Sequence, residues 1–222
     1  MSCCQRLKCD ILGMVIWRTG AGFIETLGLG LSVEIRQAGR DDLYNTAVFL
    51  DDCWREVYRD IVSDVFLGAM SPEERHKGLI KRYDDGSSDF WMMLDNERLI
   101  GAAVFGKSFT EGYENDGEIS AIYLHKDYIG KGHGHNAFVR IEQALRDKGY
   151  ANLVLDVLSA NSRAIDFYLK HGYKKVADRT IKLGESEYPL TILRKKVRHN
   201  SIFQADGVFD RVQSFLAGVA AE

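Results

Sequence analysis

The segment Ile129–Gly134 has the residue types of a site for a phosphate group. Its glycines stand at alternate positions, so the backbone can present successive N–H groups to an anion. Lys131 adds a positive charge, and a helix expected to begin near Gly132 adds the positive end of its dipole, about half a unit charge. Because a strand is expected to end at Leu124, the segment lies between a strand and a helix, which predicts a pyrophosphate site. The alternative for such a segment alone is a glycine-rich connection without a ligand.

A second segment, Gly101–Ser108, matches the nucleotide phosphate-loop pattern GxxxxGK[ST] at every fixed position. A phosphate loop must follow a strand and open a helix, because the amides of the helix N-terminus bind the phosphates. Here the apolar residues inside the motif form the predicted strand itself, and a turn-rich stretch follows. The match therefore does not predict a nucleotide-hydrolysing site.

Histidines and cysteines do not form a metal site in the sequence. His133 and His135 diverge on the first turn of the expected helix and have no third ligand nearby, so no metal is expected. Three of the four cysteines lie within the first ten residues and the fourth is Cys53, a distribution that cannot cross-link a core. This usage favours a reducing, cytoplasmic location.

Composition limits the classes of protein that remain. Of the 222 residues, 45% are hydrophobic and 27% charged, which indicates a globular chain of one domain with some excess length. The net charge of −3 lacks the basic excess of a nucleic-acid binder, so no nucleic-acid partner is expected. No apolar run approaches about 18 residues, so neither a membrane span nor a signal peptide is expected.

The elements that must position the glycine-rich segment follow from apolar periodicity and turn signals. Strands are expected at 33–37, 90–94, 99–105, 118–124 and 153–157, with two more within 173–197, and helices from Asp41 or Asp42, after Ser71, over 132–148 and over 162–171. The first helix carries an apolar stripe that is expected to be buried: Leu43, Ala47, Leu50, Trp54 and Val57. Hairpins followed by a βαβα run predict a mixed α/β sheet.

Two motifs resemble those of the GNAT superfamily of acetyl-CoA-dependent N-acetyltransferases. Gly132 and Gly134 fill the last two fixed places of the family pattern [QR]xxGx[GA], whereas Ile129 stands where Gln or Arg is usual. The segment Asn161–Tyr173 is similar to the family pattern NxxAxxFYxxxGF. The resemblance covers roughly residues 33–198. It implies an α/β (α+β) fold with a mixed, mostly antiparallel sheet of six to seven strands, a splay between the fourth and fifth strands, and helices on both faces.

The resemblance implies a reaction as well as a fold. The protein is expected to be an N-acetyltransferase that moves an acetyl group from acetyl-CoA, its cosubstrate, to a primary amine by direct attack in a ternary complex. The acceptor is expected to be a small-molecule amine. The alternatives are an amine of a protein or peptide, and a catalytically degenerate module that binds acyl-CoA without turnover.

The resemblance also assigns roles to residues. An alkylamine with a pKa near 10.4 is only about 0.04% neutral at pH 7, so its proton must be removed. Glu118 stands where relatives place the base, with a water chain as the alternative, and Tyr168 stands where relatives protonate the leaving thiolate. The residues expected to bind the cofactor are Tyr123, Leu124, Ile129, Gly130, Lys131, Gly132, His133, Gly134 and Asn161.

The acceptor pocket is expected on the first long helix. Trp54 and Tyr58 are its candidate residues, although the apolar stripe makes core packing the alternative for Trp54. Nearby acids either attract a cationic amine or form a solvated face: Asp51, Asp52, Asp60 and Asp64.

Three parts of the chain are expected. Residues 1–32 are a leader of uncertain structure, residues 33–198 the acetyltransferase domain, and residues 199–222 a C-terminal amphipathic helix or tail. Apolar residues recur on one face of a helix over 207–222. Such a face needs a partner, either the body of the same chain or a second subunit, so a homodimer is possible.

Overall fold

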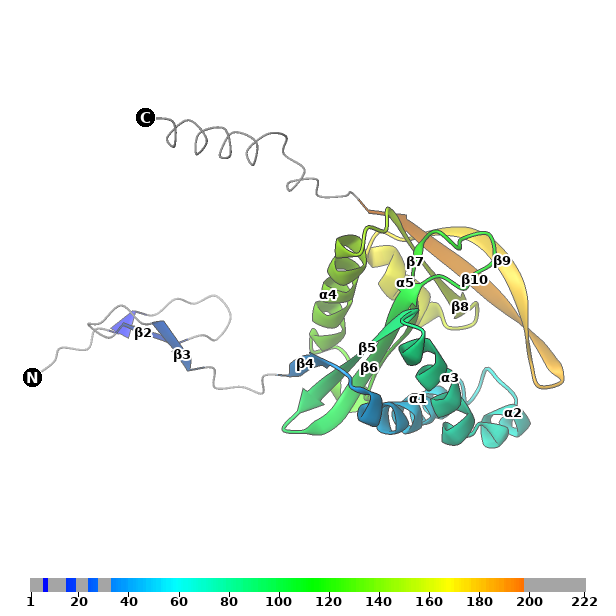
Figure 1. The fold of residues 1–222 in the computed structure, drawn as a ribbon, viewed down its shortest axis with the longest axis horizontal. Coiled ribbons are helices and arrows are strands. Elements are labelled where there is room, and N and C mark those ends of the chain that lie inside the picture. Colours follow the sequence, from blue (N-terminus) through cyan, green and yellow to red (C-terminus); the bar gives the residue numbers. More distant parts are fainter. Residues whose placement is uncertain (1–5, 8–14, 19–23, 28–32, 198–222) are drawn as a thin grey trace, which may run out of the picture. The chain divides into compact units, whose positions relative to one another are not determined.

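The computed structural model of the protein describes residues 6–7, 15–18, 24–27 and 33–197 (Figure 1). Three short strands precede the main body: β1 (Arg6–Leu7), β2 (Val15–Arg18) and β3 (Ile24–Leu27). They form an antiparallel sheet in the order β1-β2-β3. The helix expected over 207–222 lies outside the described residues.

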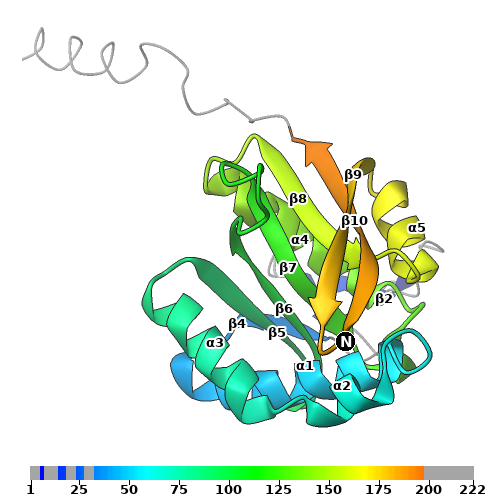
Figure 2. The ribbon, with the colours of Figure 1, turned by 90° about the vertical axis from the view of Figure 1, so that its right-hand side faces the viewer.

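The main sheet has seven strands in the order β4-β5-β6-β7-β8-β10-β9. These are β4 (Glu34–Gln37), β5 (Ser88–Asp95), β6 (Arg98–Lys107), β7 (Gly117–Leu124), β8 (Asn152–Leu158), β9 (Lys174–Leu183) and β10 (Ser186–Lys196). Strands β4 and β5 pair antiparallel, as do β8 and β10, whereas β7 and β8 pair in parallel (Figure 2). The predicted mixed α+β fold with a largely antiparallel sheet is confirmed.

The helices follow the sequence signals closely. They are α1 (Leu43–Val57), α2 (Asp64–Ala69), α3 (Pro72–Asp84), α4 (His133–Asp147) and α5 (Ser162–Lys170), with short 3-10 turns at Arg40–Asp42 and Lys126–Tyr128. Helix α3 follows Ser71 as predicted, and Ser71 caps it, because its hydroxyl accepts a hydrogen bond from the Glu74 N–H at 3.4 Å. The six-residue helix α2 was not predicted, because it is too short to show a helical period. No helix in the described ranges is long and apolar enough to cross a membrane.

The described chain divides into two compact units. One comprises residues up to Phe105 together with 120–139 and 183–186. The other comprises 106–119, 140–182 and the chain from Glu187.

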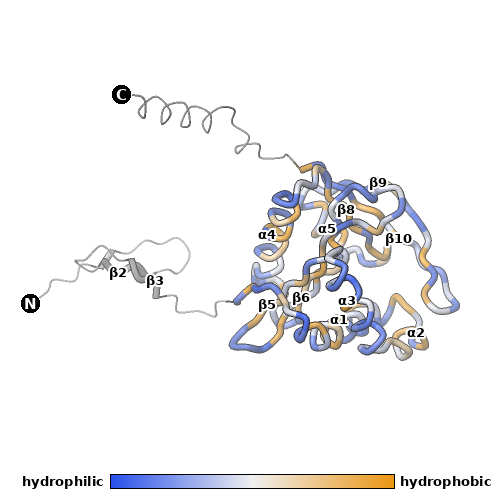
Figure 3. Tube along the Cα trace, in the orientation of Figure 1, coloured by the Kyte–Doolittle hydropathy of each residue, from blue (hydrophilic) through white to orange (hydrophobic). Residues whose placement is uncertain are grey.

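In the first unit, strands β5 and β6 are covered by helices on both faces. Hydrophobic residues lie in the middle of these strands, and the turn that joins them is hydrophilic (Figure 3). One face packs on α1 and α3 through the cluster Ala38, Leu43, Ala47, Leu50, Leu79, Phe90, Met92, Leu94, Ala102 and Val104. On the other face Met93 and Ile100 pack on Ala137 of α4. Successive β5 residues thus face opposite layers, as the two-residue period of a strand requires.

The apolar stripe of α1 is buried only along its first part. Leu43, Ala47 and Leu50 join the core cluster, but Trp54 is half-buried and Val57 is 40% exposed. The prediction for Val57 is wrong, because this last residue of α1 lies beyond the cluster that packs on β5 and β6. Tyr58, the next residue, is buried in its place.

Candidate active site

The glycine-rich segment lies where the sequence predicts it, between a strand and a helix. Strand β7 ends at Leu124 and α4 begins at His133. Gly130 and Gly132 have φ angles of +81° and +86°, a left-handed conformation that side chains disfavour. The first N–H groups of α4 have no acceptor within the helix. The segment therefore turns the chain so that it enters a helix N-terminus.

Hydrogen bonds fix this turn to the β5–β6 hairpin. The N–H of His125 donates to the carbonyl of Ile100 at 2.7 Å, and the Tyr128 hydroxyl donates to Asp95 Oδ2 at 2.6 Å. The Asp95 carboxylate raises the pKa of Tyr128, so the phenol stays protonated. Lys131 Nζ lies 5.3 Å from the centre of the Tyr128 ring. The Lys131 ammonium group thus lies over the Tyr128 ring, which the hydrogen bond to Asp95 holds in place.

Gly134 is a glycine that the fold itself does not need. Its backbone is not in the left-handed region, and a Cβ atom built on it would have no neighbour within 4 Å. Gly78, on the exposed side of α3, is equally open, so openness alone does not mark a site. Gly134 differs because it lies in the first turn of a helix, where a side chain would stand beside the amides that can bind an anion.

The segment 101–108, which matches the phosphate-loop pattern, lies almost entirely within a buried strand. Residues 101–107 all belong to β6, and only the last of them is exposed. A Cβ on Gly101 would stand 2.8 Å from Met93 Sδ and 2.9 Å from Leu124 Cδ1. Gly101 is therefore needed for close packing, and the segment opens no helix.

Three of the predicted residues meet in the first unit. The rings of Trp54 and Tyr58 are 4.5 Å apart between centroids, and the hydroxyls of Tyr58 and Tyr123 are 3.4 Å apart. The Arg75 guanidinium lies 5.9 Å from the centre of the Trp54 ring. The half-buried Trp54 ring therefore contacts both the Tyr58 ring and a cation.

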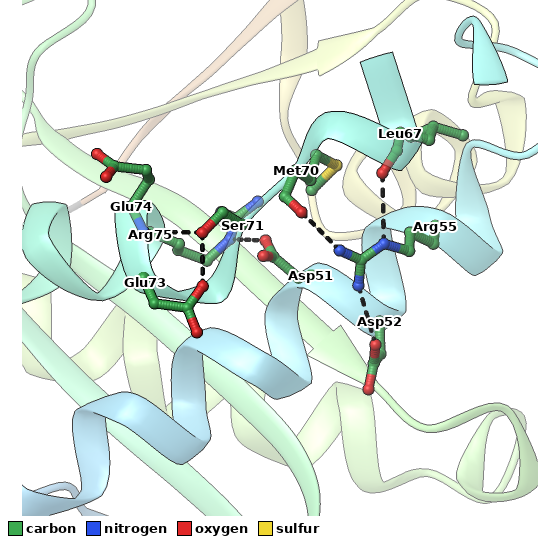
Figure 4. A network of polar contacts seen from close by, with 9 residues as sticks. All are labelled: Asp51, Asp52, Arg55, Leu67, Met70, Ser71, Glu73, Glu74 and Arg75. Carbon is green, nitrogen blue, oxygen red and sulfur yellow. Dashed lines mark hydrogen bonds and ion pairs between the residues drawn. The ribbon is translucent and has the colours of Figure 1, made fainter. Parts of the chain in front are cut away.

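Two acidic residues of α1, Asp51 and Asp52, are engaged by arginines (Figure 4). Asp51 is 1% exposed and pairs with Arg75, while its Oδ2 has no hydrogen-bond partner. Arg55 pairs with Asp52 at 3.1 Å and donates to two carbonyls at the end of α2, those of Leu67 and Met70. Asp51 therefore does not lie on a solvated face, because it ties α1 to α3.

In the second unit, Glu118 holds a turn. Its Oε2 atom accepts hydrogen bonds from the Ser108 hydroxyl at 3.1 Å and the Phe109 N–H at 2.8 Å. The N–H and hydroxyl of Thr110 donate to the same oxygen at 3.1 and 3.0 Å. Glu118 is 9% exposed. Four donors thus converge on one carboxylate oxygen of the residue expected to be the base.

Sequence reasoning missed a second carboxylate in this unit, that of Asp156 on β8. Solvent reaches this side chain, yet surrounding protein atoms desolvate the carboxylate. Desolvation and the charge of Glu118 raise the pKa of Asp156 to about 6, and Arg179 acts in the opposite direction. The signal in the sequence was a single acid within the apolar strand Leu153–Leu158.

The motif residues of α5 are also in the second unit. Asn161 caps the helix, since its Oδ1 accepts a hydrogen bond from the Ala164 N–H at 3.1 Å. Tyr168 is half-buried, with its ring centroid 5.5 Å from that of Phe167 and 6.1 Å from that of Tyr173. The side chain of Asn161 therefore closes the N-terminus of α5.

Metal ligands and a reactive thiol are not found in the described ranges. No group of three or more His, Cys, Asp or Glu residues there is placed to hold a metal ion. Cys53 is buried, and desolvation raises the pKa of its thiol to about 12, which disfavours the reactive thiolate.

Comparison with known proteins identifies the class. The model of the acetyltransferase (GNAT) family matches residues 52–173, more than half of the chain. The chain therefore belongs to the GNAT family, and the protein is an acyltransferase of the N-acetyltransferase type.

Individual relatives are distant. An uncharacterized N-acetyltransferase of Bacillus subtilis, YuaI, is 27% identical over 154 residues, 68% of this chain and 86% of the relative. Spermidine N(1)-acetyltransferase of Thermoplasma acidophilum is 23% identical over 150 residues, 65% of this chain and 89% of the relative. The crystal structure of the PaiA N-acetyltransferase from the same organism, in complex with coenzyme A, gives a TM-score of 0.61 at 24% identity and covers 75% of this chain and 100% of that one. This structural likeness establishes the fold.

Proposed function

We propose that the protein transfers the acetyl group of acetyl-CoA to the primary amine of a small molecule by direct attack in a ternary complex. The observation that carries the proposal is the turn at 129–134, whose open glycines lead into the first turn of α4. Helix N-terminal amides and a nearby cation are suited to a pyrophosphate. Solved GNAT structures from Thermoplasma acidophilum and Salmonella typhimurium contain coenzyme A and acetyl-CoA, respectively.

In this proposal the backbone does most of the cofactor binding. The turn from Ile129 to Gly134 binds the pyrophosphate, the backbone of Tyr123 and Leu124 pairs with the pantetheine arm, and Asn161 contributes a side chain. Ile129 has no polar side chain where the family usually has one, and its N–H donates to the carbonyl of Lys126 at 3.1 Å. A backbone donor at Leu124 would polarise the thioester carbonyl.

The chemistry needs one proton to move from nitrogen to sulfur. The amine nitrogen attacks the carbonyl carbon of the thioester, a C–N bond forms and the C–S bond breaks. A carboxylate of the chain or a water chain takes the proton from nitrogen. The family resemblance implies Glu118 for this role. Tyr168 donates a proton to the leaving thiolate.

The proposed acceptor site includes Trp54 and Tyr58. The half-buried Trp54 ring offers apolar area, which suits the carbon chain of a small amine, and the buried Tyr58 ring packs against it with its hydroxyl 3.4 Å from that of Tyr123. Spermidine, the substrate in the name of one relative, is such an amine. The cytoplasmic location remains a prediction that rests on cysteine usage.

Two measurements test the proposal. Acetyl-CoA, but not ATP, should raise the melting temperature, and a free-thiol release assay should detect turnover with some members of an amine panel that includes spermidine and peptides with free N-termini. A missing shift at millimolar acetyl-CoA would refute the cofactor assignment. Turnover only with peptides would favour a protein or peptide acceptor, and binding without turnover on any amine would indicate a degenerate binding module.

A further inference from the structure

Two carboxylates of the second unit lie on one face of the sheet. Glu118 of β7 pairs in parallel with Val154 of β8, so their side chains point to the same side. Asp156 follows Val154 by two residues and therefore points to that side as well. The charge of Glu118 acts on Asp156, which agrees with their closeness.

The Glu118 carboxylate is engaged in hydrogen bonds that stabilise a loop. Its Oε2 gathers the donors of Ser108, Phe109 and Thr110, and protonation of that oxygen would replace an acceptor by a donor. A further hydrogen bond joins the two ends of the loop between β6 and β7, where the Ser108 N–H donates to the carbonyl of Asp116 at 3.2 Å. Arg194 then holds the Asp116 carboxylate with two hydrogen bonds, at 2.5 and 2.9 Å. Glu118 therefore has the environment of a residue that shapes a loop.

Asp156 has the opposite environment. Its side chain is exposed, and within the described part of the chain no hydrogen bond or ion pair involves its carboxylate. The residue paired with it on β10 is the apolar Ile192. Both carboxylate oxygens are thus available to a proton or an amine.

We propose that Asp156 is the group that accepts the proton of the acceptor amine, and that Glu118 is a positioning residue for the loop beside it. The inference rests on the proposed acetyl transfer. As the amine nitrogen forms its bond to the acetyl carbon, the N–H proton passes to the Asp156 carboxylate, and the C–S bond breaks. The thiolate takes a proton from Tyr168, Tyr168 regains a proton from water, and Asp156 releases its proton to water.

The titration of Asp156 supports this role. Its pKa of about 6 arises from desolvation and from Glu118 on β7, against Arg179 on β9, while Ile192 on β10 adds no charge. A base works best when its pKa lies near the working pH, so that it is ionised yet binds a proton well. A carboxylate with its ordinary pKa near 3.9 would be a weaker base.

The test compares Asp156→Asn with Glu118→Gln in the wild-type background, on the amine that the panel finds best. Asp156→Asn should lower kcat by about 100-fold or more, leave the KM for acetyl-CoA within about threefold, and abolish the rise of kcat with pH near 6. Asp156→Glu should recover part of kcat. Glu118→Gln should lower the melting temperature and keep the rise but move it to lower pH, because the charge of Glu118 contributes to the raised pKa of Asp156. Asp166→Asn, an exposed acid on α5, is the control and should change none of these.

A stability measurement keeps the test independent of turnover. Because the pKa of Asp156 is higher in the folded protein than in an unfolded chain, its ionisation costs stability as the pH rises from about 4 through about 6. Asp156→Asn should therefore raise the melting temperature at pH 8, and this gain should shrink toward pH 4. Wild-type kcat in Asp156→Asn, or loss of the pH-dependent rise in Glu118→Gln, would overturn the inference alone. A wild type without turnover would overturn the proposed function and the inference together.

Discussion

Two glycine-rich segments of this protein carry a lysine after a glycine, and each matches a phosphate-binding pattern. Gly101–Ser108 matches its pattern fully and lies almost entirely inside the buried strand β6. Ile129–Gly134 matches its family pattern incompletely and forms an exposed turn before α4. In the first segment a glycine makes room for Met93 and Leu124, whereas in the second the glycines leave room for something outside the chain. The element that follows a glycine motif is therefore more informative than the number of matching letters.

A substitution at Gly134 tests most directly whether the glycine turn, unlike the buried segment, binds a ligand. Gly134→Leu should weaken acetyl-CoA binding by about 100-fold, or about 2.7 kcal/mol, because the side chain would cover the amides of the first helical turn. The melting temperature without ligand should not fall, since the position is open and helical. Titration calorimetry measures the affinity. Gly78→Leu on α3 is the matched control, and equal losses in both variants would show that the turn is not the binding site.

The buried segment should respond in stability. Gly101→Val should lower the free energy of unfolding by about 1–3 kcal/mol, because its side chain would overlap Met93 and Leu124. Urea denaturation measures this loss. A variant as stable as the wild type would mean that β6 has room that the packing does not indicate.

The two lysines give a smaller contrast. Lys131→Ala should weaken acetyl-CoA binding by about three- to tenfold at low salt, and less in high salt, because one exposed cation is screened. Lys107→Ala should leave the affinity unchanged, and ATP should not bind either variant. If the wild type bound ATP and Lys107→Ala did not, β6 would have to be reconsidered as a nucleotide site.

The smallest expected effect is a gain. Ile129→Gln restores the residue type that the family pattern prefers and adds one donor to the turn, so acetyl-CoA should bind about threefold more tightly. Ile129 is 37% exposed, so the change should cost little apolar burial. Weaker binding in this variant would show that Ile129 contributes apolar contact to the ligand.

Much of the fold could be predicted because its signals are local. The Ser71 cap, the turn between β5 and β6 and the strand, turn and helix around Gly132 depend on residues adjacent in the chain. Contacts between distant segments could not be predicted in the same way. Asp156 escaped notice because its relation to Glu118 arises only from the parallel register of β7 and β8. Likewise, Asp51 was expected either to attract a cationic amine or to lie on a solvated face, because its ion pair with Arg75 of α3 joins residues 24 positions apart.

The bond between Tyr128 and Asp95 has a consequence for how ligand binding can be observed. It joins the glycine turn to the end of β5, next to the hairpin turn where Asn96 and Glu97 have φ angles of +47° and +68°. A ligand that immobilises the glycine turn should therefore slow amide hydrogen exchange in the hairpin as well. Tyr128→Phe should uncouple the two segments, so that exchange slows in the turn alone.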